Sequence, residues 1–151
     1  MKGTILYAEY DEATGISKVI KQTKYGTFTR SVRVHPEDAD IANPHDGCYF
    51  AELKCDIAAY QQRAKFMQER AKGITHVFNV LSHADVQQDP YIQEMKEEWY
   101  KLAHQADIAW KNAEDAFETY HILKDAYTAL VDQTLRQRRD FREKIEKKRR
   151  G

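Results

Sequence analysis

Apolar residues recur at alternating steps of three and four along two long segments of the chain. In the first segment they are Phe50, Leu53, Ile57, Tyr60, Ala64, Met67, Ala71, Ile74, Phe78 and Leu81. In the second segment they are Ile92, Met95, Trp99, Leu102, Ala106, Ala109, Ala113, Ala116, Tyr120, Leu123, Tyr127 and Leu130. This spacing is typical of helices that bury one narrow seam against another helix. The pattern therefore predicts two long amphipathic helices.

Both helices begin at a recognisable start signal. Asn43 is a good N-cap because its side chain accepts hydrogen bonds from the first backbone N–H groups, and Pro44 fits the first helical position. Asp89 and Pro90 repeat the arrangement. Gly73 lies inside the first helix and costs about 1 kcal/mol relative to Ala. We expect the helix to continue through it.

A chain reversal near Val86 turns the two helices into an antiparallel coiled-coil hairpin. In that register, large side chains mostly face small ones, as close helix packing requires. The expected pairs are Leu81 with Ile92, Ile74 with Trp99, Met67 with Ala106, Tyr60 with Ala113 and Phe50 with Leu123.

A second apolar stripe lies off this seam on the second helix. Trp110 and Phe117 are seven residues apart, and the hairpin covers the second helix only to about Leu123. An uncovered stripe is an aggregation liability. We therefore expect a homodimer or higher homo-oligomer, with an interface at Trp110, Phe117, Tyr127 and Leu130.

The N-terminal segment has a different pattern, rich in β-branched and aromatic residues. Residues 4–10, 16–23 and 27–35 are separated by turn signals at Gly15 and Gly26 and predict a three-stranded meander. In the third strand Phe28, Val32 and Val34 share one face, which we expect to be buried against the helices. The predicted fold is α+β and mainly α, with the sheet and a loop in residues 1–43 and the hairpin in residues 44–151, packed as one structural unit.

Composition agrees with long solvated helices. Of the 151 residues 32% are charged, and there are only 6 Gly and 3 Pro. The 24 basic and 24 acidic residues cancel, so no global field attracts nucleic acid or an anionic membrane. Locally, residues 136–150 carry nine Lys or Arg against three acids, whereas residues 85–118 carry nine acids against three lysines.

Cysteine content and hydropathy predict a cytoplasmic protein. Two cysteines make no disulfide framework, and no apolar run has the length of a membrane span or the form of a signal peptide. Cys48 and Cys55 are seven residues apart on a helix, about 10 Å along its axis, which is too far to share one zinc ion. We expect two buried thiols.

No motif in the chain indicates catalysis. Six histidines are scattered without a zinc-protease motif, a nucleophile elbow or a glycine-rich phosphate loop nearby. We therefore expect a protein that is not an enzyme and that uses no cofactor or metal.

The densest polar cluster lies where the sheet leads into the first helix. Its arginines suit a phosphate or carboxylate, and its acids could orient them or bind a ribose. The alternative is a set of solvated strand residues paired with nearby acids. The candidate ligand- or partner-binding residues are Arg30, Arg33, His35, Glu37 and Asp38.

The basic end of the second helix is a second candidate site. One helical face can present several Lys or Arg to a nucleic-acid backbone. The alternative is a solvated helix end stabilised by pairs such as Asp140 with Lys144 and Glu143 with Lys147. The candidate nucleic-acid residues are Arg136, Arg138, Arg139, Arg142, Lys147 and Arg149.

Residues 32–52, VRVHPEDADIANPHDGCYFAE, resemble small proteins encoded by phages and prophages of Gram-positive bacteria. In those proteins a short hairpin leads through an HPED-type turn into a helix containing Ala-Glu, and the resemblance covers about the first 70 residues. It implies antagonism of host defence in the host cytoplasm, either by binding a host defence protein or by sequestering a nucleotide signal, as anti-Thoeris sponges do. A nucleic-acid-binding accessory protein is the alternative function.

Overall fold

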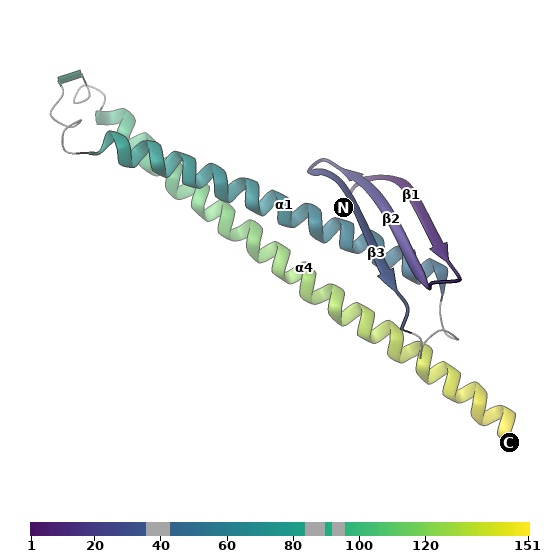
Figure 1. Cartoon of the computed structure of the whole chain (residues 1–151). Coiled ribbons are helices and arrows are strands. Elements are labelled where there is room, and N and C mark those ends of the chain that lie inside the picture. Colours follow the sequence, from purple (N-terminus) through teal and green to yellow (C-terminus); the bar gives the residue numbers. More distant parts are fainter. Residues whose placement is uncertain (36–42, 84–89, 92–95) are drawn as a thin grey trace. The chain divides into compact units, whose positions relative to one another are not determined.

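The computed structural model describes residues 1–35, 43–83, 90–91 and 96–151. Along the chain it contains strands β1 (Gly3–Asp11), β2 (Ile16–Thr23) and β3 (Gly26–Arg33), then helices α1 (Pro44–Leu81) and α4 (Lys96–Arg150) (Figure 1). A three-stranded antiparallel sheet is thus followed by two long helices that pack against each other. The predicted fold, α+β and mainly α, is confirmed.

The described residues divide into two compact units. The first, called the sheet unit below, contains residues Met1–Ala59 and His121–Gly151. The second, called the hairpin unit, contains residues Tyr60–Tyr120. Each helix contributes one part to each unit.

The sheet has β2 at its centre, with β1 and β3 as antiparallel neighbours. The turn before β2 needs Gly15, whose φ of 69° is a left-handed conformation that glycine adopts without steric cost. The edge strand β1 is exposed over most of its length and has an irregular register between Ile5 and Tyr7. All three predicted strands are confirmed to within a few residues.

One face of the sheet packs on the first four turns of α1. Val19, Ala51 and Cys55 form the buried core, with Phe28 and Val32 packed against it. Gly47 lets the helix approach closely, because a Cβ atom at this position would clash with Ser17 Oγ. The predicted burial of the Phe28 face of β3 is confirmed.

The start and the continuity of α1 agree with expectation. Asn43 Oδ1 accepts hydrogen bonds from the backbone N–H groups of His45 (2.9 Å) and Asp46 (3.4 Å), so Asn43 is the N-cap. The helix runs through Gly73 without interruption. The predicted reversal near Val86, the Asp89 cap and the seam positions Ile92 and Met95 lie outside the described residues.

The contacts between the helices lie further along α4 than the predicted register places them. The Phe50 ring packs edge-on against Tyr127, with ring centroids 6.4 Å apart, where Leu123 was expected. A shift of four residues keeps the same face of a helix toward its partner, so the apolar spacing does not distinguish the two registers. The expectation that α1 covers α4 only to about Leu123 was wrong, because Arg138 also contacts the first turn of α1.

No helix in the described ranges has an apolar stretch long enough to cross a membrane.

Candidate functional site

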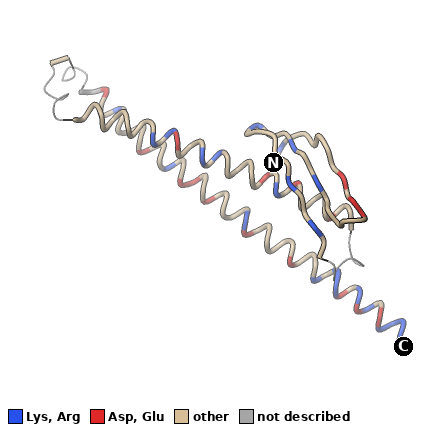
Figure 2. The backbone as a smooth tube through the Cα atoms, in the orientation of Figure 1, with Lys and Arg blue, Asp and Glu red and all other residues tan. Residues whose placement is uncertain are grey.

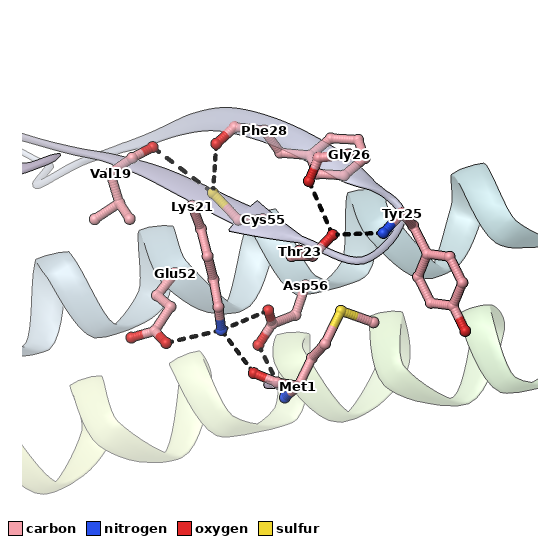
Figure 3. Close-up of polar contacts among 10 residues, drawn as sticks. All are labelled: Met1, Val19, Lys21, Thr23, Tyr25, Gly26, Phe28, Glu52, Cys55 and Asp56. Atoms are coloured by element: carbon pink, nitrogen blue, oxygen red, sulfur yellow. Dashed lines mark hydrogen bonds and ion pairs between the residues drawn. The ribbon is translucent and has the colours of Figure 1, made fainter. Parts of the chain in front are cut away.

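A buried ammonium group lies between the sheet and α1 in the sheet unit. Lys21 is only 2% exposed and points from β2 toward two acids on the first turns of α1 (Figure 3). Its Nζ lies 2.8 Å from Asp56 Oδ1 and 2.9 Å from Glu52 Oε1, and it donates to the Met1 carbonyl oxygen at 2.9 Å. The Met1 amine in turn lies 3.5 Å from Asp56 Oδ2. We call Lys21, Glu52 and Asp56 the buried charge cluster.

The charges in this cluster support one another. Burial alone lowers the pKa of Lys21, but the hydrogen bonds to Asp56 and Glu52 and their negative charges outweigh that effect and raise its pKa. Lys21 therefore stays protonated at neutral pH. A lysine that is charged at neutral pH and held by two carboxylates is unsuited to act as a general base, and removing one partner would leave an uncompensated buried charge.

The thiol of Cys55 is buried directly beside this cluster. Its Sγ lies 3.4 Å from the Phe28 carbonyl oxygen and 3.7 Å from that of Val19 (Figure 3). Burial raises the pKa of Cys55, so the unreactive thiol form persists at neutral pH. The expected buried thiol is confirmed for Cys55, whereas Cys48 is half-buried at the edge of the core.

A small pocket in the sheet unit lies at the end of β3, and we call it the β3-end pocket. Its volume is about 170 Å³. The end of β3, the first turns of α1 and the segment of α4 after Tyr127 all contribute to its lining. The apolar lining consists of Val32, Val34, Phe50, Val131 and Leu135, and the polar lining includes Arg33, His35, Asp46, Thr134 and Arg138.

One ion pair connects the two helices at this pocket. Arg138 Nη2 and Nε donate to Asp46 Oδ2 at 2.9 and 3.2 Å. Asp46 lies in the first turn of α1, where the positive end of the helix dipole favours a carboxylate. The pair thus holds one guanidinium group at the pocket, although both side chains remain partly exposed.

The structure brings together only part of the first predicted site. Arg33 and His35 both line the β3-end pocket. Arg30 pairs in register with Val19 and lies on the α1 side of the sheet, whereas Arg33 pairs with Ile16, so the two arginines lie on opposite faces. Arg30 is exposed and donates a hydrogen bond to the Thr29 carbonyl oxygen. Glu37 and Asp38 lie outside the described residues.

The predicted nucleic-acid residues form the last turns of α4 (Figure 2). Arg136, Lys147 and Arg149 are exposed there. Arg138 is held by Asp46, so this member of the basic segment belongs to the β3-end pocket as well. The remaining members, Arg139 and Arg142, both interact with other residues.

The four predicted interface residues are all half-buried within the chain. In the hairpin unit the indole N–H of Trp110 donates to Thr75 Oγ1 at 2.8 Å. In the sheet unit the Tyr127 ring contacts Phe50, and burial raises the pKa of Tyr127. Phe117 and Leu130 belong to the hairpin unit and the sheet unit respectively.

Sequence reasoning missed the buried charge cluster and the α4 wall of the pocket. Lys21 alternates with Ser17, Val19 and Thr23, a mixed series that does not identify a buried face. Thr134 interrupts the apolar seam of α4, which is the one sequence signal for a pocket at that position.

Within the described ranges, no cluster of three or more side chains could hold a metal ion. Comparisons with protein families, with curated proteins and with solved structures found no match to this chain.

Proposed function

We propose that this chain is a non-enzymatic binding protein that engages a partner protein through the β3-end pocket. The observation that carries the proposal is the meeting of two predicted sites at that pocket. Arg33 at the end of β3, His35 just after it and Arg138 from the basic end of α4 all line the pocket, together with the apolar residues named above. A mostly apolar pocket with a few convergent polar groups is the usual form of a binding site.

The size of the pocket favours a protein partner over a sequestered nucleotide. Small-molecule pockets commonly have volumes of about 300 to 1,000 Å³. The β3-end pocket, at about 170 Å³, has room for one side chain but not for a whole nucleotide. Its apolar lining beside the Arg138 guanidinium suits an apolar anchor residue flanked by an acid on the partner.

The ionisable groups that are buried support a binding role without catalysis. A general base or a nucleophile needs a pKa close to the working pH. Lys21 and Cys55 both have pKa values raised away from neutrality, so Lys21 remains an ammonium and Cys55 a thiol. The resemblance of residues 32–52 to phage proteins makes a host defence protein in the cytoplasm the first partner class to test.

A pocket-filling substitution tests the proposal. Thr134 lines the pocket, so the T134F substitution should place a phenyl ring in it. The substitution also removes the hydrogen bond from the Thr134 hydroxyl to the Leu130 carbonyl oxygen. Thr128 makes the same kind of bond to Lys124 from an exposed position, and T128F is the matched control. Crosslinking and affinity capture in the native host should recover one partner with the wild type and T128F but not with T134F.

Two results would count against this function. Equal capture by T134F and T128F would place the partner elsewhere on the chain. Thermal stabilisation by a cyclic nucleotide that T134F abolishes would show instead that the pocket serves a nucleotide ligand.

The alternative function is a nucleic-acid-binding accessory protein. The net charge of +6 in residues 136–150, with Arg136, Lys147 and Arg149 exposed, favours it. Fluorescence anisotropy with a labelled duplex should then give an affinity that falls steeply with salt, and K147Q/R149Q should reduce the salt slope by about 2. An affinity unchanged by this double substitution would exclude the basic end as the contact.

A further inference from the structure

The hairpin unit has a core made only of small residues. Its buried residues among those described are Ala64, Ala71, Ala106, Ala113 and Ala116. Alanines let two helices approach closely, but each buries little apolar surface. Several large apolar side chains of this unit are exposed instead, among them Phe66, Val77, Val80 and Ile108.

One flank of the hairpin unit forms a groove lined by apolar and polar residues. Phe66 from α1 is 67% exposed and Ile108 from α4 is 47% exposed, and both line a depression of about 360 Å³. Met67, Ile74 and Ala109 also line it, and its polar residues are Arg70, Gln105 and Asn112. Val77 and Val80 of α1 are also exposed. They lie on the same side of the helix as Phe66, because the positions on that side recur at steps of four and three: Phe66, Arg70, Gly73, Val77 and Val80. This spacing is that of a second helix-packing seam.

The charges of the hairpin unit divide between its two helices. Residues 60–81 of α1 carry four basic residues and one acid, a net charge of +3. Residues 98–120 of α4 carry five acids and two lysines, a net charge of −3. The blue residues of α1 and the red residues of α4 in Figure 2 follow this division.

We infer that this groove binds the same groove of a second copy, so that two hairpin units form a four-helix bundle. A two-fold axis parallel to the helices places α1 of one copy over α4 of the other, which brings the +3 and −3 segments together twice. Such an arrangement buries Phe66 and Ile108 of both copies at the centre of the interface.

The extent of the flank fits this partner. The 22 residues of α1 in the unit span about 33 Å, and two helices side by side are about 20 Å wide, a projected area of roughly 700 Å². Stable interfaces bury about 800 Å² on each partner. A second copy provides a flank of equal length with complementary charge.

Phe66→Glu tests the interface in the full chain, with Phe141→Glu as the matched control. Phe141 is 64% exposed on the basic part of α4, so the two variants make the same change at similar exposure. Sedimentation velocity over a concentration series should show a dimer for the wild type and F141E. F66E should raise the dissociation constant at least a hundredfold. Each dimer loses two buried Phe66 side chains, and the loss of each corresponds to about a tenfold weaker affinity, or about 1.4 kcal/mol. I108E should do the same, and circular dichroism should show unchanged helix content.

The opposite flank provides a direct contrast. Phe117 is nine residues from Ile108, about two and a half helical turns, and so faces away from the groove. Dissociation by F117E but not by F66E would overturn the inference, as would a wild type that is monomeric throughout the series. The inference does not depend on the proposed function, because the β3-end pocket belongs to the other unit.

Discussion

Arg138 donates two hydrogen bonds to Asp46 Oδ2, although 92 residues separate the two side chains along the chain. The pair ties the late part of α4 to the first turn of α1 and completes one side of the β3-end pocket. It thereby links the predicted basic segment to the predicted sheet site.

The Arg138–Asp46 pair should contribute modestly to stability. Both side chains are partly exposed, and pairs of this kind contribute about 0.2–1 kcal/mol. Urea unfolding of R138A, D46N and the double variant should give a coupling free energy in that range, and R136A is the control for loss of one exposed charge. A coupling energy of zero would show that the pair does not hold the helices in solution.

Substitutions in the buried charge cluster should be much more costly. Lys21→Met leaves two carboxylates without their partner, and breaking a buried pair costs about 3–5 kcal/mol. Asp56→Asn should cost more than Glu52→Gln, because the side chain of Asp56 is 12% exposed and that of Glu52 is 36% exposed. Chemical denaturation measures all three. The reverse order of D56N and E52Q would contradict the assigned geometry.

Two glycines of α1 should respond to alanine with opposite signs. Gly47→Ala introduces a Cβ atom that clashes with Ser17, and overpacking of this kind costs about 1–3 kcal/mol. Gly73 has open space around it in the helix interior, so Gly73→Ala should stabilise by about 0.5–1 kcal/mol. Thermal unfolding compares the two variants, and S17G should rescue G47A. If G47A and G73A have equal melting temperatures, the close approach of α1 to β2 is wrong.

The free energy of unfolding should fall at alkaline pH. The pKa values of Cys55, Tyr127 and Lys21 are all raised from their ordinary values of 9.0, 10.0 and 10.5. Each group therefore holds its proton more tightly in the folded state than in the unfolded state. The stability it contributes is complete below the unfolded pKa and is lost as pH rises through the folded pKa.

Cys55 has the lowest ordinary pKa of the three, 9.0, so the loss should begin above about pH 9. Melting temperatures measured from neutral to strongly alkaline pH should fall for the wild type from that point, whereas Cys55→Ala should delay the fall until Tyr127 and Lys21 titrate. Identical pH profiles for the two proteins would show that the Cys55 thiol is not buried as described.

Local pattern was enough to predict most of the fold. The steps of three and four define a helical face, Asn43 with Pro44 defines a helix start, and alternation with turn glycines defines the strands. Each of these signals depends on residues close together in the chain. Over such short stretches the geometry of a helix or strand alone fixes the face on which each side chain lies. The helices, the continuity through Gly73 and the three strands follow from it.

Only the tertiary structure decided which surfaces meet. On β2 the even-numbered positions carry Ile16 and Ile20, yet the buried face holds Ser17, Val19 and Lys21, and Ser17 lies directly against Gly47 of α1. The contact of Phe50 with Tyr127 differs from the predicted one by a helical turn that periodicity cannot detect. Charge partners, register and the β3-end pocket depend on distances between segments remote in sequence, and those distances are set by packing rather than by local pattern.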